Sequence, residues 1–160
     1  MIRLSFVLGT GLSSRLVAWY GQGVGGWSHV DAVLASGELL GARADAIGGQ
    51  PAGVHIRPPN YEKWKRRAIV EIPYEGAAWE LWLRKQVGLE YDKGAILSFI
   101  TGIQDHQAGH WICSACQYGA LESVSLLHPC PLPSSQVTPD TLFMLVTAGL
   151  GGKIIYTLGE

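Results

Sequence analysis

The chain has little net charge, few charged residues and no long apolar run, and each absence excludes a class of protein. Its 160 residues include 12 Lys or Arg and 13 Asp or Glu, which leaves a formal net charge of -1. Because positive and negative residues are nearly equal in number, the protein has no positive field to attract phosphates. We therefore expect no nucleic-acid partner. Charged residues and repeated glycines interrupt the apolar N-terminal half well before the ~20 residues of a membrane span, so we expect no spanning segment.

Basic residues are scattered except at one place. Lys63, Lys65, Arg66 and Arg67 follow one another closely. We interpret this group as the solvated face of a helix start or a turn.

Cysteine is also scarce. Three cysteines cannot all pair within one chain, and free thiols are typical of a reducing compartment. The opening MIRLSFVL leads into Gly-Thr-Gly rather than a small-residue cleavage site, so it predicts a first β-strand and not a secretion signal. These features predict a cytoplasmic protein.

The chain does have enough apolar sequence to build one core. Apolar residues make up 48% of it and charged residues 16%, a composition typical of globular proteins. The length fits a single domain over residues 1–160, and we expect an α+β fold with strands early and helices late. The residue pattern predicts strands at about 2–8, 29–34, 38–43, 53–57, 68–73 and 153–157, and helices at about 13–20, 75–87, 92–101, 113–123 and from Thr138-Pro139-Asp140 onward.

Cys113 stands where a loop meets one of these expected helices. Partial positive charge at a helix N-terminus lowers the pKa of a thiol there and favours the thiolate. His29, on an expected strand, can act as the base, and Asp31 follows on the same face of that strand. Cys113, His29 and Asp31 are therefore a candidate nucleophile, base and orienting acid.

Several short motifs occur in a particular order along the chain. Ser28-His29 precedes a hairpin, Gly88 ends a helix, Tyr91-Asp92 follows, and Cys113-Ser114 opens the next helix. Over about residues 1–145 this order resembles the circularly permuted papain-like (NlpC-type) cysteine hydrolases, in which the histidine precedes the cysteine. The resemblance implies an antiparallel sheet that carries the histidine, packed against a helix whose N-terminus carries the cysteine.

The same resemblance implies a cysteine peptidase or amidase that cleaves an amide bond, as in cell-wall peptides, in a bacterial or phage setting. We expect no metal and no other cofactor. Related permuted enzymes include lipid-directed acyltransferases and thioesterases, so a lipid or other acyl substrate remains open. A further alternative is a papain-like scaffold without turnover, used as a binding or structural module, for example in a phage-related assembly.

The third member of the catalytic set is the least determined. Relatives often have a polar residue on the strand after the histidine, where this chain has Gly41-Ala42-Arg43, and a Glu where it has Ala115. We place Asp31 first because it shares a face with His29. Asp45 is the second choice if the hairpin is tight, and Glu38 and His55 come after it.

Four residues are candidate walls of the cleft: Trp27, Trp111, Tyr91 and Ser114. Two competing chemistries use the same helix start. His106, His110, Cys113 and Cys116 could hold a zinc ion, although their spacing does not match common zinc fingers. Cys113 and Cys116 also have the spacing of a redox pair, without the βαβ pattern of a thioredoxin-like fold. Cys130 reads as a buried loop thiol.

Overall fold

A computed structural model describes residues 1–10, 26–92, 94, 110–127 and 132–159. The helix expected at 13–20 lies outside these residues, as do His106, Cys130 and most of the helix expected at 92–101. All structural statements below concern the described residues.

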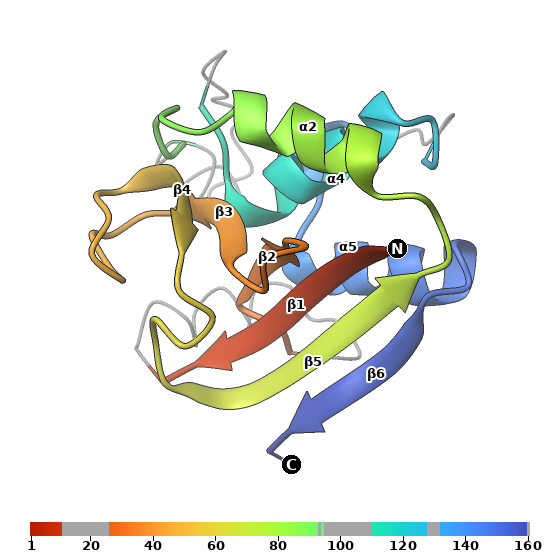
Figure 1. Cartoon of the computed structure of the whole chain (residues 1–160), viewed down its shortest axis with the longest axis horizontal. Helices are drawn as coiled ribbons and strands as arrows, with labels where there is room; N and C mark the ends of the chain where they lie inside the picture. Colours follow the sequence, from red (N-terminus) through yellow and green to blue (C-terminus); the bar gives the residue numbers. More distant parts are fainter. Residues whose placement is uncertain (11–25, 93, 95–109, 128–131, 160) are drawn as a thin grey trace.

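The described chain forms a six-stranded sheet in which every neighbouring pair of strands is antiparallel (Figure 1). The order across the sheet is β4-β3-β2-β1-β5-β6, so the first strand is central. With the helices described below, this confirms the expected α+β class. The strands are β1 (Ile2–Gly9), β2 (His29–Val33), β3 (Leu39–Arg43), β4 (Gly53–Arg57), β5 (Trp64–Ile72) and β6 (Lys153–Leu158).

The β2–β3 connection is the tight hairpin that its sequence predicts. The N–H of Leu34 donates to the Glu38 carbonyl at 2.9 Å, and Gly37 has a φ of 87°. Glycine suits that left-handed position because it has no Cβ to clash.

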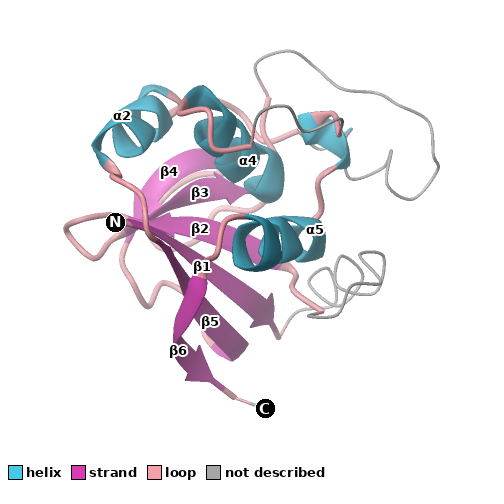
Figure 2. Cartoon of the chain, turned by 90° about the vertical axis from the view of Figure 1, so that its right-hand side faces the viewer, coloured by secondary structure: helices cyan, strands magenta, loops and turns pink. Residues whose placement is uncertain are grey.

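Three helices lie on one side of the sheet (Figure 2): α2 (Ala77–Lys85), α4 (Cys113–Ser123) and α5 (Pro139–Met144). A short turn, η1 (Ser134–Gln136), precedes α5, and a π-helical turn, η2 (Leu145–Gly149), continues it. The Thr138 side chain caps α5 by accepting from the Thr141 N–H at 3.1 Å, and Pro139 takes the first helical position. Apolar side chains between sheet and helices, such as Phe6, Val30 and Leu121, form the core.

Helix α4 begins where β2 and β3 stop pairing. Their ladder covers two pairs, Ala32 with Leu40 and Val33 with Leu39, and α4 packs against both strands. The Gln117 side-chain amide donates to the Leu40 carbonyl at 2.9 Å, which ties the helix to β3. This packing brings the start of α4 next to the first residues of β2.

The basic group at residues 63–67 is not a helix start or a turn, which corrects our interpretation. Lys63 directly precedes β5, and the other three residues lie in its first half, because β5 begins at Trp64 rather than near residue 68. Successive residues of a strand point to opposite faces, so Arg66 and Arg67 have different neighbours. The Arg66 guanidinium lies 4.3 Å from the centre of the Trp27 ring, and Arg67 Nε donates to Ser5 Oγ at 2.9 Å.

None of the helices in the described ranges is both long enough and apolar enough to cross a bilayer.

Candidate active site

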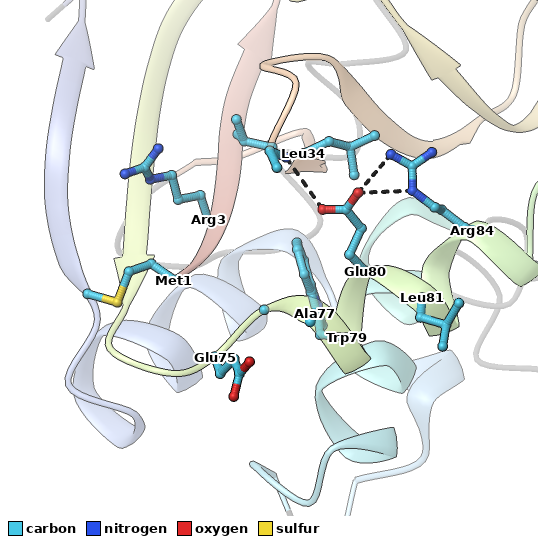
Figure 3. A pocket seen from close by; sticks show the side chains of 12 residues that line it. Met1, Arg3, Leu34, Glu75, Ala77, Trp79, Glu80, Leu81 and Arg84 are labelled. Atoms are coloured by element: carbon cyan, nitrogen blue, oxygen red, sulfur yellow. Dashed lines mark hydrogen bonds and ion pairs between the residues drawn. The ribbon is translucent and has the colours of Figure 1, made fainter.

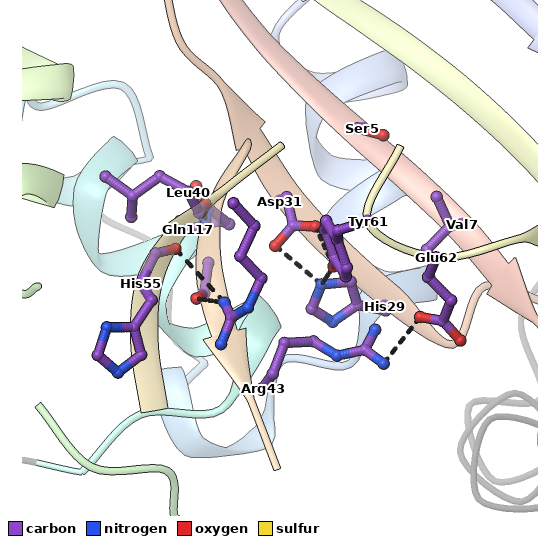
Figure 4. Close-up of polar contacts among 12 residues, drawn as sticks. Ser5, Val7, His29, Asp31, Leu40, Arg43, His55, Tyr61, Glu62 and Gln117 are labelled. Atoms are coloured by element: carbon purple, nitrogen blue, oxygen red, sulfur yellow. Dashed lines mark hydrogen bonds and ion pairs between the residues drawn. The ribbon is translucent and has the colours of Figure 1, made fainter. Parts of the chain in front are cut away.

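His29 and Asp31 lie side by side on β2 and are in direct contact. His29 Nε2 is 2.8 Å from Asp31 Oδ1 (Figure 4). Both side chains are almost completely buried, at 7% and 2% exposure. Residues two apart on a strand share a face, and here that spacing orients the imidazole through a buried carboxylate.

Tyr61 completes this arrangement from the segment between β4 and β5. Its hydroxyl donates to Asp31 Oδ2 at 2.8 Å and lies 3.3 Å from His29 Nε2. Its ring meets Trp64 edge to face, with centroids 5.2 Å apart. Our sequence reasoning missed Tyr61, because nothing in its local pattern marks it as a partner of a residue 30 positions earlier.

Cys113 is the first residue of α4, and the preceding Ile112 is extended. Its thiol lies close enough to the His29 side chain and the Val30 backbone for both to lower its pKa. The partly unsatisfied N–H groups of the first helical turn add partial positive charge beside the thiol.

The electrostatics of the three groups favour a charged pair. Burial opposes ionisation of the Cys113 thiol, but the His29 charge and the hydrogen bonds outweigh it, so the pKa of Cys113 is lowered. Burial also opposes protonation of His29, but Asp31 and Cys113 together raise the pKa of His29 to about 9. The pKa of Asp31 is lowered, because the His29 charge and the bonds from His29 and Tyr61 exceed the effect of burial. All three shifts favour the charged forms, a thiolate, an imidazolium and a carboxylate.

Two arginines support the polar cluster from β3 and β4. Arg43 lies 2.8 Å from Glu62 and 3.4 Å from Asp45, and its charge partly offsets the rise in the pKa of His29. Arg57 is buried and donates to five backbone carbonyls, those of Gly41, Ile47, Pro51, Gly53 and His55. Arg57 thereby fixes the loop between β3 and β4 beside the site.

The alternative third residues lie elsewhere. The Asp45 side chain is 61% exposed and faces Arg43. Glu38 is exposed and accepts a bond from the Ser36 hydroxyl at 2.9 Å. His55 lies on β4, opposite Gly41 and two strands away from β2. Among the predicted orienting residues, Asp31 is the one the structure brings to His29.

Tyr91 lies near Cys113. It forms a short bridge with Trp111 and packs beside Ile112. Burial and the Cys113 charge both raise the pKa of the Tyr91 hydroxyl. This bridge anchors the chain just ahead of Cys113.

The other residues expected to line the cleft pack against, or hydrogen-bond to, neighbouring parts of the fold. Trp111 meets Trp82 edge to face at 5.6 Å and donates to Gln86 Oε1 at 3.2 Å. The Ser114 hydroxyl is buried and donates to the Val137 carbonyl. Trp27 lies in the hydrophobic core, 5% exposed, beside Phe143, which differs from the cleft wall we expected.

The two competing chemistries have limited support in the described ranges. Among the described residues, no three His, Cys, Asp or Glu side chains are grouped to hold a metal ion. His106 of the proposed zinc set lies outside the described residues. His110 pairs with Glu90 at 3.1 Å. Cys113 and Cys116 are both free thiols.

A cavity of about 570 Å³ opens at the other end of β2, between the start of β1, the β2–β3 turn and α2 (Figure 3). Glu80 on its wall is held by two bonds from Arg84, at 2.9 and 2.7 Å, and by the Ala35 N–H at 3.4 Å. None of Cys113, His29 or Asp31 lines it. Glu80 and Arg84 on its wall pair with each other, Arg3 pairs with Glu71, and we assign the cavity no role.

Comparison with known proteins adds no relative: no protein-family model matches the chain, and no curated protein matches it. A functional assignment therefore has to be argued from the site itself.

Proposed function

We propose that this chain is a cysteine hydrolase of the permuted papain-like kind, with Cys113 as nucleophile, His29 as base and acid, and Asp31 as the orienting residue. The observation that carries the proposal is the buried His29–Asp31 pair beside a thiol at a helix N-terminus, whose pKa His29 lowers. A nucleophile, a base and a group that orients the base are the set that acyl-transfer chemistry needs.

In the proposed reaction the Cys113 thiolate attacks the carbonyl carbon of an amide. The backbone N–H groups at the start of α4, that of Cys113 included, stabilise the oxyanion that forms. His29 then gives its proton to the leaving nitrogen, and the acyl group stays on the sulfur. His29 next takes a proton from a water molecule, whose oxygen attacks the acyl carbon. The C–S bond breaks, the acid leaves, and the Cys113 thiolate and the His29 imidazolium are restored.

Asp31 and Tyr61 act on His29 rather than on the substrate. The Asp31 carboxylate holds Nε2 and thereby orients the imidazole. Tyr61 donates to the same carboxylate and covers it. Because all three groups are largely buried, water competes little with these bonds, and the imidazole keeps one orientation.

The substrate class comes from the resemblance alone. The permuted papain-like enzymes make an amide of the cell-wall peptide kind the first substrate to test.

Selective alkylation tests the proposal without a known substrate. Reduced protein is treated with iodoacetamide at pH 6, and labelling of each cysteine is followed by mass spectrometry. We expect Cys113 to react much faster than Cys116 and Cys130, because an ordinary thiol is almost fully protonated at this pH. His29→Ala should slow the labelling of Cys113 on the order of 100-fold.

Cys116 and Cys130 serve as internal controls in the same sample. If all three thiols react slowly and alike in the folded protein, the hydrolase proposal fails, and a binding module without turnover becomes the better account.

A further inference from the structure

The proposed mechanism leaves one buried nucleophile unused. Cys116 lies on α4, three residues after Cys113, and is completely buried. Both thiols are free and belong to the same hydrophobic cluster. The negative charge of Cys113 and burial together raise the pKa of the Cys116 thiol, so the two sulfurs differ in reactivity although they are neighbours.

Helix geometry places these cysteines within bonding range of each other. Residues three apart on an α-helix lie on one face with Cα atoms about 5 Å apart, inside the separation that a disulfide spans. The Cys116 N–H donates to the Ile112 carbonyl at 3.0 Å and closes the first helical turn. Because Ile112 is extended, Cys113 has helical structure on one side only, which leaves its backbone freer to adjust than in the middle of a helix.

We propose that Cys113 and Cys116 are an oxidation site, at which a hydroperoxide converts the pair into a reversible disulfide that switches the nucleophile off. The inference rests on the proposed function in one respect, that Cys113 is the reactive thiol. This proposal differs from the redox pair considered in the sequence analysis. Here the two cysteines would protect a hydrolytic site and would not serve as an electron carrier.

The chemistry balances with the hydroperoxide as the oxidant. The Cys113 thiolate attacks the terminal oxygen of ROOH, the O–O bond breaks, and ROH leaves after taking up a proton. Sulfur is thereby oxidised to a sulfenic acid, Cys113–SOH. The Cys116 sulfur then attacks the Cys113 sulfur, hydroxide leaves and takes the Cys116 proton as water. In sum, two thiols and ROOH give one disulfide, ROH and water.

The order of these steps follows from the difference between the two thiols. The thiolate is the reactive form, and Cys113 has it stabilised by His29, whereas Cys116 stays protonated. Cys113 is therefore oxidised first. The neutral sulfenic acid no longer opposes ionisation of Cys116, whose thiolate resolves the product before it reaches the irreversible sulfinic acid. A dithiol reductant would restore the nucleophile.

Hydrogen peroxide is the probe for the test. Folded wild-type protein is oxidised, denatured, alkylated and analysed by mass spectrometry. We expect the peptide that contains both cysteines to lose two hydrogen atoms and to take up no label, and dithiothreitol to restore labelling of both. In Cys116→Ser, Cys113 should instead be trapped as a sulfenic acid by dimedone and proceed to a form that dithiothreitol does not reduce.

Because Cys116 is fully buried, Cys116→Ala is tested in parallel, and each variant is first shown to be folded by circular dichroism. Cys130→Ser should behave as the wild type. A Cys113 that is oxidised while Cys116 still takes label, or that pairs with Cys130, would overturn the proposal.

The two proposals fail separately. Fast alkylation of Cys113 in reduced protein, with no Cys113–Cys116 disulfide after peroxide, refutes the switch and leaves the hydrolase intact. Slow and equal alkylation of all thiols, with a disulfide that still forms, refutes the hydrolase and leaves a reversible disulfide that switches off no nucleophile.

Discussion

The Asp31 carboxylate on β2 fills the space that a side chain at Gly41 on β3 would need. A Cβ added at Gly41 would overlap the Asp31 carboxylate. The permuted papain-like enzymes often place a polar orienting residue on the strand after the histidine, and here that strand carries glycine. Asp31, from the histidine's own strand, occupies the space that a side chain at position 41 would fill, so glycine there leaves room for the buried carboxylate.

Gly41→Ala should therefore damage the site through Asp31. The added methyl group forces the carboxylate away from His29 Nε2, and the imidazolium loses its partner. We expect iodoacetamide labelling of Cys113 at pH 6 to slow by about 10-fold, equivalent to roughly one unit of pKa. Gly149→Ala is the matched control, because a Cβ there meets no atom within 4 Å. Equal labelling rates in the two variants would remove Asp31 from the mechanism.

The titration of His29 should be displaced far from that of an ordinary histidine. Its pKa is raised to about 9, against a usual value of 6.5, so the ring stays protonated through neutral pH and loses its proton as the pH rises through about 9. Asp31→Asn removes a negative charge that raises the pKa, so the midpoint should fall. NMR titration of the ring measures both midpoints. A wild-type midpoint near 6.5 would contradict the proposed ion pair.

Tyr61→Phe isolates the hydroxyl, because the ring and its contact with Trp64 remain. Loss of the bond to Asp31 Oδ2 removes one of the effects that lower the pKa of Asp31. We expect a threefold to 10-fold slower labelling of Cys113, in line with about 1 kcal/mol for a hydrogen bond. Tyr74→Phe, at an exposed tyrosine, is the control and should leave the rate unchanged.

Arg57→Met should lower the stability of the fold. The change leaves five backbone carbonyls without their buried donor, and the loop between β3 and β4 loses its anchor. We expect the free energy of unfolding to fall by about 2–4 kcal/mol, measured by urea denaturation. Arg3→Met breaks an exposed ion pair with Glu71 and should change the free energy of unfolding by less than about 1 kcal/mol. Similar losses in both would show that Arg57 is not an anchor.

Much of this protein follows from local sequence. The predicted strand at 53–57 and helix at 113–123 coincide with β4 and α4, and Thr138 caps α5 as its sequence indicates. These features depend on near neighbours: alternation, glycine in a turn, and a side chain that can accept a bond from the next helical turn. The same local rule places His29 and Asp31 on one face of a strand.

The rest was decided by the tertiary structure. Arg57 and Tyr61 reach the site because β4 pairs with β3, a pairing that no local pattern specifies, whereas the β2–β3 hairpin beside Gly41 follows from its turn sequence. The basic group at 63–67 became part of a strand because β5 pairs with β1 along its length, and Trp27 became a core residue by packing against Phe6 and Phe143. The sequence by itself determined which residues could be nucleophile, base and acid, and only the packing of α4 against β2 brought the cysteine to the histidine.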